Sequence, residues 1–437
     1  MFAFRVLPAA LLLAACGFPR PERVGDAGLD APTDAEIPPG ISIRVAGTGD
    51  DANDGITQPV KTLKHAIGLA AANPAITSIV LATGRYASDG GEIFPYTVPA
   101  NLTILGPAGG GAILAGSTHE PGITIDSGTL RDLELEDFTV AVTATGTTHL
   151  SGLHIRTGLT AMRAGGNANV TIDNVDIAGT PGACAKGIEL SGAAQLTATA
   201  LVTRALKTSI QAQDQTTLIL SHTDTTGSHC DYTSAVISLS TDKVFVMEDS
   251  SIDGGDYGIN SVGASSPPRL TIHNTNIKNL TQTAINMDNG VLEVIGGTFS
   301  NQPAALIFSN VNVTITDATL TQHMGAAIQL GGGQFKMRNC TFTANHEGLY
   351  IPAAFPIDLG TEMGPGNNIF QNGFNSIGLE VESNIPAHVS AIGNTWRPGV
   401  QGADAAGHYP KSTINGPVGF EAAQGNFKLP MGASMDL

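Results

Sequence analysis

A short pattern of strand, turn and strand recurs through the middle of this chain and limits its possible folds more than any other feature. It reads V-T-I-D-N-V-D-I at Val170 and returns as L-T-I-H-N-T-N-I at Leu270 and V-T-I-T-D-A-T-L at Val313. Units of this length cannot bury their own apolar residues, so they must stack on one another. Eight units align, and they begin at Val170, Leu196, Leu218, Phe245, Leu270, Leu292, Val313 and Phe335.

Apolar and polar residues alternate at the start of each unit, which indicates a short strand with one buried face. We count the first residue of a unit as position 0. Position 1 is mostly Thr, Glu or Lys. Position 2 is apolar in every unit, where it is Ile172, Ala198, Leu220, Met247, Ile272, Val294, Ile315 and Met337.

Position 4 marks a turn between two strands, because Asn and Asp tolerate left-handed backbone and bond to their own chain. Ala200 and Gly296 are the exceptions at this position. The other units carry Asn174, His222, Asp249, Asn274, Asp317 and Asn339. Apolar residues return at position 7 in most units, which indicates that the second strand also has a buried face.

Coils of about 22 residues built from several short strands predict an all-β solenoid, the right-handed parallel β-helix. Stacked coils lie roughly 4.8 Å apart and place like residues above like. An antiparallel sandwich also uses many short strands, but it does not need the same polar turn at one fixed position. A leucine-rich repeat is disfavoured because these coils lack helical periodicity.

Composition agrees with a β-rich body that has many tight turns. The chain has 437 residues, of which 53 are Gly and 14% are charged. A β-rich body with tight turns fits this composition better than a disordered chain or a helical bundle. The net charge of −17 argues against a nucleic-acid partner, whereas it permits a cationic one.

Residues 1–15 are expected to form a signal peptide, with Arg5 before the apolar run V-L-P-A-A-L-L-L-A-A. The run ends in L-A-A-C, which resembles the lipobox of bacterial lipoproteins. The resemblance implies that Cys16 becomes a lipidated N-terminus, and Gly17 after it favours the outer membrane of a Gram-negative bacterium. The protein would then lie on the periplasmic face or at the cell surface. Ordinary cleavage, with Cys16 incidental, is the alternative.

Residues 16–40 continue as a Pro-, Ala- and Asp-rich tether without apolar periodicity. The folded body then begins in residues 41–75 with the strand I-S-I-R-V and a short helix. Thr62 can cap that helix, which would run to about Ala72. Leu63, Ala66, Ile67 and Ala70 form its apolar stripe.

An acidic turn, G-D-D-A-N-D-G, precedes the helix. Its spacing does not match an EF-hand, which favours a structural turn over a calcium site.

This opening segment resembles secreted β-helix proteins that carry the domain of unknown function 1565, and polysaccharide lyase family nine. D-L-G-T at Asp358 and G-N-N-I-F at Gly366 also resemble the domain 1565 family. The resemblance implies a pectate-lyase-like β-helix over residues 76–397, with the helix as an N-terminal cap. The tail, 398–437, would wrap the other end, which Trp396 would plug. The domain 1565 family itself has no settled activity.

Two cysteines in the coils are candidates for a disulfide. Cys184 and Cys230 lie in loops two coils apart, about 10 Å along the axis, which only flexible loops could close. An exported compartment favours oxidation. A zinc site that also uses His222 and His229 is the alternative, and Cys340 at position 5 is expected to face the core.

No complete catalytic constellation is apparent in the coils. A calcium-dependent lyase needs clustered Asp carboxylates and a nearby base, and the best candidates are Asp249, Asp253 and Asp256 near Lys278. Asp249, however, already fits the turn at position 4. A hydrolase needs two facing carboxylates, and none can be named from the sequence.

We therefore expect a surface-tethered outer-membrane lipoprotein with a non-catalytic carbohydrate-recognition or structural role. Its partners would be the membrane, through the lipid on Cys16, and a polysaccharide. No catalytic residue and no cofactor are assigned. The alternative is a calcium-dependent polysaccharide lyase or another polysaccharide-degrading enzyme, because fold alone cannot decide function.

Overall fold

The computed structural model describes most of the chain after residue 39. Cys16, the leader, almost all of the tether and His229 lie outside the described residues. The described ranges are 40–117, 119–228, 230, 234–261, 268–353, 355–372, 377–382, 388–398, 403–410, 413–415, 427–431 and 433–437.

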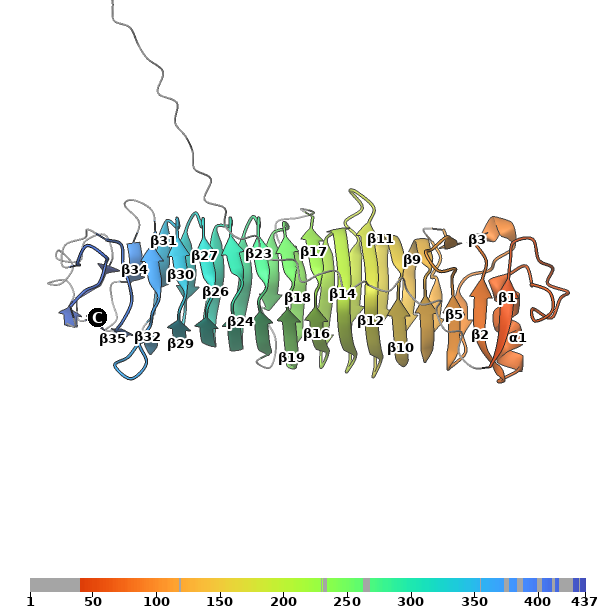
Figure 1. Ribbon diagram of the computed structural model, residues 1–437, viewed down its shortest axis with the longest axis horizontal. Helices are drawn as coiled ribbons and strands as arrows, with labels where there is room; N and C mark the ends of the chain where they lie inside the picture. The colour runs from red at the N-terminus through yellow and green to blue at the C-terminus, as the bar shows by residue number, and fades with distance from the viewer. Residues whose placement is uncertain are drawn as a thin grey trace, which may run out of the picture. The chain divides into compact units, whose positions relative to one another are not determined.

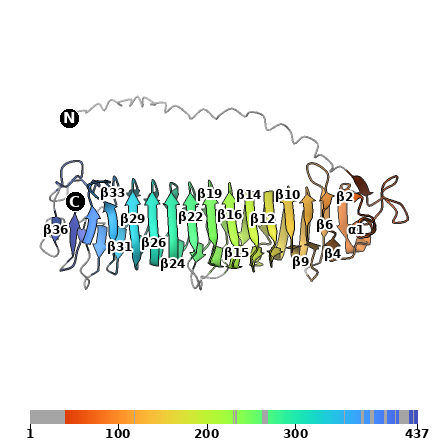
Figure 2. The ribbon, with the colours of Figure 1, turned by 90° about the horizontal axis from the view of Figure 1, so that it is seen from below.

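Parallel strands stack coil upon coil along one axis, and each complete coil passes through three stacks of strands (Figures 1 and 2). Stack a holds positions 0 to 3 of the repeat. It consists of β1 (Ile41–Val45), β2 (Ile76–Leu81), β5 (Leu102–Leu105), β8 (Gly128–Arg131), β10 (Thr147–Ser151), β12 (Asn169–Gly179), β14 (Gln195–Leu206), β16 (Thr217–Ser221), β19 (Val244–Glu248), β22 (Arg269–His273), β24 (Thr283–Ile295), β26 (Ala304–Thr316), β29 (Gly333–Arg338), β32 (Ile357–Gly360), β35 (His388–Ala391) and β38 (Ser434–Asp436).

Stack b follows the turn at position 4. It consists of β3 (Gly84–Ala87), β6 (Ala112–Ala115), β9 (Glu134–Ala144), β11 (His154–Ala164), β12, β14, β17 (Asp224–Gly227), β20 (Ser251–Asp253), β23 (Asn276–Lys278), β25 (Thr298–Ser300), β27 (Thr319–Thr321), β30 (Thr341–Thr343) and β33 (Ile369–Gln371).

Stack c closes each coil, and several long strands bend from one stack into the next. It consists of β4 (Tyr96–Val98), β7 (Ile123–Ile125), β9, β11, β13 (Lys186–Leu190), β15 (Thr208–Asp214), β18 (Ala235–Thr241), β21 (Tyr257–Ser261), β24, β26, β28 (Ala326–Leu330), β31 (Glu347–Ile351), β34 (Ile377–Val381) and β37 (Phe427–Lys428).

The register of stack a is the one that the repeat predicts. The position 2 residues of the eight units pair with one another from coil to coil, and each is at most 1% exposed. The successive pairs are Ile172 with Ala198, Ala198 with Leu220, Leu220 with Met247, Met247 with Ile272, Ile272 with Val294, Val294 with Ile315, and Ile315 with Met337. The predicted right-handed parallel β-helix is confirmed.

The turn at position 4 has left-handed backbone in all eight units, with φ between 45° and 70°. Ala200 adopts it as well, although alanine disfavours this region, so the surrounding coils impose the corner. Side-chain amides link successive corners where Asn is available. Asn274 donates to Asp249 at 3.2 Å, and Asn339 donates to Asp317 at 3.0 Å.

Helix α1 (Leu63–Ala72) covers the N-terminal end, as predicted. Thr62 Oγ1 accepts the His65 N–H at 3.1 Å, and the expected stripe is buried. Glu92, which is 4% exposed, lies between the 3₁₀ turn η1 (Ser88–Gly90) and β4, and it accepts the Leu63 N–H at 2.7 Å and the Tyr96 hydroxyl at 2.6 Å. This buried carboxylate joins the first turn of the helix to stack c. Within the described ranges, no helix has the length and apolar character that crossing a bilayer requires.

Stacked aromatic rings fill the C-terminal end of the core. The ring centroids of Phe342 and Phe370 lie 4.8 Å apart, and those of Phe370 and Trp396 lie 4.2 Å apart with the two rings nearly parallel. Trp396 is fully buried, and Phe427 packs edge-on against it at 4.5 Å. The described parts of the tail extend the stacks, because β37 pairs with β34 and β38 pairs with β35. β36 (Thr413–Asn415) pairs antiparallel with β38.

The register predicts opposite outcomes for two adjacent substitutions. Ile272→Asn places an amide in the core and removes a buried side chain, so it should lower the free energy of unfolding by roughly 4 kcal/mol. Thr271→Asn changes a partly exposed residue and should cost less than about 0.5 kcal/mol. Urea unfolding of both variants measures the difference, and equal losses would refute the register.

Candidate functional site

The structure joins Cys184 and Cys230 in a disulfide, with 5.6 Å between the two Cα atoms. Both residues lie in loops between stacks b and c. The coil between them connects β14 to β15 through Lys207 alone, so the bridge passes over a very short turn. His222 occupies the left-handed corner at position 4. Cys340 is fully buried, as expected.

The three candidate lyase carboxylates are engaged by the neighbouring coil. Asp249 accepts from Asn274, and Asp253 accepts from Asn279 Nδ2 at 2.7 Å and lies 3.3 Å from Lys278 Nζ. Asp256 is 2% exposed and accepts the Thr281 hydroxyl at 2.7 Å. Among the residues that the structure describes, no group of three His, Cys, Asp or Glu side chains is placed to hold a metal.

The carboxylates of the acidic turn before α1 also form hydrogen bonds within the fold. Asp51 accepts the backbone N–H groups of Lys61 and Thr62 and the Thr62 hydroxyl, at 2.8 to 2.9 Å. Asp54 accepts the backbone N–H groups of Ile56 and Thr57. These bonds order the loop that leads into the helix.

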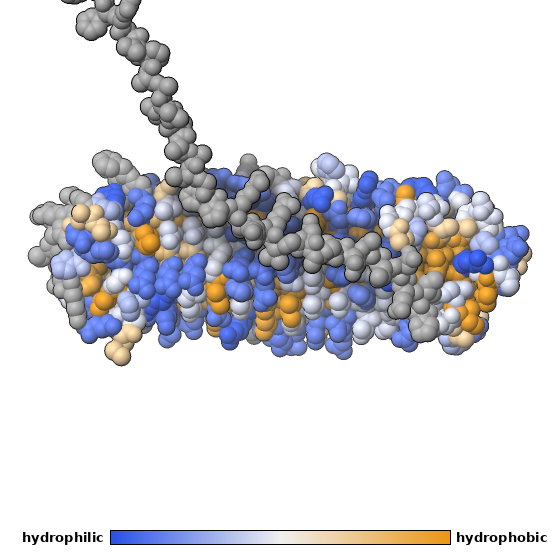
Figure 3. Space-filling model, viewed as in Figure 1, coloured by the Kyte–Doolittle hydropathy of each residue, from blue (hydrophilic) through white to orange (hydrophobic). Residues whose placement is uncertain are grey.

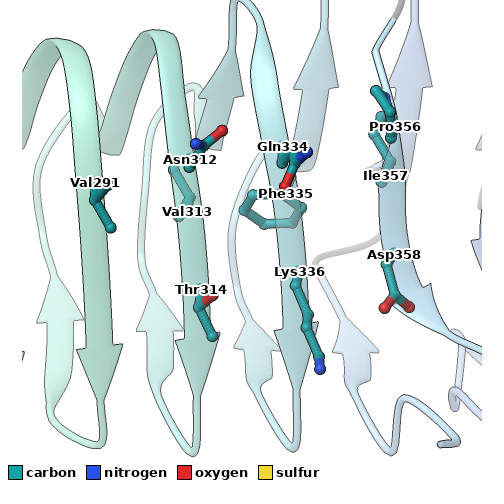
Figure 4. Close-up of a pocket in the computed structure, with 10 residues that line it drawn as sticks. All are labelled: Val291, Asn312, Val313, Thr314, Gln334, Phe335, Lys336, Pro356, Ile357 and Asp358. Atoms are coloured by element: carbon teal, nitrogen blue, oxygen red, sulfur yellow. The ribbon is translucent and has the colours of Figure 1, made fainter.

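A groove of about 350 Å³ lies on the outer side of stack a, across β24, β26, β29 and β32 (Figure 4). Amide, hydroxyl, ammonium and carboxylate groups line it together with apolar side chains. Outward-facing members are Val291, Asn312, Thr314, Gln334, Lys336, Pro356 and Asp358, and Val313, Phe335 and Ile357 form its floor. The face of the molecule in Figure 3 is mostly hydrophilic with separate apolar spots. In the groove, Val291 is an apolar side chain that remains 38% exposed. This mixture suits a ligand with both hydroxyl groups and apolar faces.

One side of the groove is held rigid by an arginine. Arg338 Nη2 donates to both carboxylate oxygens of Asp358 at 2.7 and 2.8 Å, and its Nη1 donates to the Asp358 carbonyl at 3.0 Å. The Gly360 N–H adds a bond to the same carboxylate at 3.0 Å. These charge-assisted bonds, together with the bond from the backbone N–H, fix the position of the carboxylate.

Lys336 pairs in register with Asp358, and both side chains extend in the same direction in Figure 4. Within the described part of the chain, Lys336 forms no ion pair, since Arg338 takes the Asp358 carboxylate. Its ammonium therefore retains its hydrogen-bond donors for a ligand.

A pair of carboxyl groups lies on the outer side of stack c. Burial, the charge of Glu380 and a hydrogen bond with Glu380 together raise the pKa of Glu347 to about 7, against a weaker opposing effect of Lys428. Lys428 in β37 bonds to Glu380 in β34. The Tyr350 hydroxyl donates to Glu382 at 2.6 Å, and this bond, followed by burial, raises the pKa of Tyr350 to about 12.

Sequence reasoning missed the pair because the two residues stand in no shared motif. They also lie at different places along the strands, because Glu347 pairs in register with Ile377 whereas Glu380 pairs with Tyr350.

The raised pKa of Glu347 predicts a pH-dependent effect of Glu347→Gln. Its pKa is higher in the folded protein than in the unfolded chain, so its contribution to stability is present below about pH 4.5 and is lost as the pH rises through about 7. We therefore compare the free energy of unfolding of the variant with that of the wild type at each pH. The difference, variant minus wild type, should be about 1 kcal/mol larger at pH 8 than at pH 5, after allowance for solvent screening.

Urea unfolding of both proteins at the two pH values measures this gain. The comparison must be made between variants, because burial lowers the pKa of His323 to about 4. Because of this histidine, both proteins lose stability as the pH falls from about 6.5 to 4, whereas the effect of Glu347 is a loss as the pH rises. An equal difference between wild type and variant at pH 5 and pH 8 would contradict the assignment.

Comparison with known proteins places the chain in a family. Residues 47–200 match the model described as "Protein of unknown function (DUF1565)", and residues 234–396 match "Right handed beta helix region". No curated protein matches the sequence.

Similar solved structures include the catalytic domain of a GH87 alpha-1,3-glucanase in complex with nigerose. It is 12% identical, with a TM-score of 0.48 over 77% of this chain and 67% of that chain. Another is the catalytic unit of the thermostable GH87 alpha-1,3-glucanase from Streptomyces thermodiastaticus strain HF3-3. It is 13% identical, with a TM-score of 0.36 over 81% of this chain and 69% of that chain. Likeness of this degree says nothing about the chemistry of the present chain. The two family matches and the stacked parallel coils together show that the chain belongs to the DUF1565 family of right-handed β-helix proteins.

Proposed function

We propose that this protein is an outer-membrane lipoprotein whose β-helix recognises carbohydrate through the groove on stack a. The observation that carries the proposal is the lining of this groove. Asn312, Gln334 and Lys336 present exposed amide and ammonium groups beside an exposed apolar side chain, Val291. Sugars offer hydroxyl groups at their edges and C–H groups on their faces, so they need this combination of polar and apolar contacts.

The way in which the groove is supported favours recognition. Its donors and acceptors stand on strands of a packed core, and Arg338 fixes the Asp358 carboxylate. Groups that are held in place before the ligand arrives lose little conformational entropy on binding.

Membrane attachment is proposed from the leader alone. The run L-A-A-C places Cys16 where lipoproteins carry their acyl chains, and several acyl chains anchor a protein stably. The Pro- and Ala-rich tether of residues 17–40 would hold the β-helix away from the bilayer surface.

Recognition is preferred over the lyase alternative because of where the aspartates stand. A lyase needs carboxylates free to bind calcium beside a base. Asp249, Asp253 and Asp256 each bond to the next coil, and the described residues include no group of three His, Cys, Asp or Glu side chains placed to hold a metal.

Lipid attachment predicts the behaviour of Cys16→Ser in the native host. The variant should leave the membrane fraction and lose labelling by a radioactive fatty acid, because it cannot carry the thioether-linked lipid. Cell fractionation and labelling measure both effects. A variant that still fractionates with the outer membrane as strongly as wild type would disprove the anchor.

Carbohydrate recognition predicts retention of the detergent-purified full-length protein on one or more members of a polysaccharide array. Gln334→Ala should reduce that binding at least fivefold, since the variant lacks an exposed amide of the groove. Gln371→Ala is the matched control, because Gln371 is an exposed glutamine on β33 of stack b.

The same samples test the lyase. Lysis of a uronate polymer produces an unsaturated product that absorbs in the ultraviolet. Calcium-dependent growth of this absorbance that disappears in Asp253→Ala would overturn the proposal in favour of the enzyme. Equal binding by the two glutamine variants would remove the groove as its site.

A further inference from the structure

The groove on stack a is built from two straight rows of side chains. One row is Val291, Asn312, Gln334 and Pro356, and the other is Thr314, Lys336 and Asp358. In-register strand pairing aligns Asn312 with Gln334, and Thr314 with Lys336. Neighbouring coils lie about 4.8 Å apart, so the four coils of the groove extend roughly 14 Å along the axis.

The rows run along the axis without a bend. The pairing of β24 with β26, and of β26 with β29, is in continuous register through the groove. Outward residues two apart on one strand lie about 7 Å from each other, so the groove is about twice as long as the separation of its rows. A ligand that contacts every coil must therefore be extended and straight.

The charge balance of the groove disfavours a polyanion. The Asp358 carboxylate is neutralised by Arg338, and the chain as a whole carries −17. A polyanionic chain would meet the negative field of the whole protein, and one ammonium group, that of Lys336, would offset it only locally. The same ammonium can donate hydrogen bonds to neutral hydroxyl groups.

We infer that the groove binds a straight, uncharged polysaccharide that lies along the axis of the β-helix and contacts it through about three consecutive sugar units. The inference rests on the proposed carbohydrate recognition and names its ligand class. It also assigns the two ends of the groove to different sugar units, with Asn312 on β26 toward one end and Asp358 on β32 at the other.

The test is a titration of the full-length protein in detergent with cello-, xylo- and N-acetylchito-oligosaccharides of one to six units. Oligogalacturonates of the same lengths serve as the charged comparison. For at least one neutral series, affinity should rise at least tenfold between two and four units and then level off, with little dependence on salt concentration. Asn312→Ala and Asp358→Asn should each weaken binding of the four-unit chain severalfold, whereas Gln371→Ala should not.

Other outcomes separate the inference from the function on which it rests. A single sugar that binds as tightly as the four-unit chain would overturn the extended ligand and leave carbohydrate recognition in place. Tighter binding of oligogalacturonates that Lys336→Met abolishes would overturn the uncharged ligand, again without harm to recognition. If none of these chains binds while the array yields another polysaccharide, the ligand class is wrong. If neither assay shows binding, the proposed function fails as well.

Discussion

One corner, repeated in all eight aligned units, fixes the register of this structure. A single left-handed residue at position 4 turns the chain from stack a into stack b, and the same turn lies above and below it. A slip of one residue in any coil would move its buried set to the outside. The corner therefore fixes the register, and the register brings Ile272 between Met247 and Val294 in the core. Bonds such as that from Asn339 to Asp317 add to this constraint from the outside.

A fixed register also decides what the surface can do. Outward residues of successive coils become neighbours at about 4.8 Å, so unrelated side chains form continuous rows. On stack a, the rows build a groove with amides, an ammonium group and a carboxylate that Arg338 holds in place. On stack c, burial and the charge of nearby Glu380 raise the pKa of Glu347. The two faces thus carry different chemical groups on one scaffold, and the amides and ammonium group of stack a suit recognition of a ligand rich in hydroxyl groups.

Sequence reasoning predicted the parts of the fold that repeat. The inward residues at positions 2 and 7, the turn at position 4 and the cap from Thr62 follow from periodicity and capping preferences, which act locally. Ala200 shows the limit of local preference, because the coils around it impose a conformation that alanine avoids. β37 and β38 escaped detection because strands of two and three residues in a Gly- and Ala-rich tail carry no periodic signal.

The surface sites were much harder to anticipate. Asp249, Asp253 and Asp256 are close in sequence, yet each bonds to the next coil, which proximity in sequence cannot reveal. The groove and the Glu347–Glu380 pair depend on residues that become neighbours only through variable coil lengths.

The most direct test of carbohydrate recognition at stack a is a crystal structure of the protein with a bound straight oligosaccharide. Our account predicts sugar density along the axis over β26, β29 and β32, within hydrogen-bond distance of Asn312, Gln334 and Lys336. Density beside Glu347 and Glu380 on stack c, with stack a empty, would contradict it.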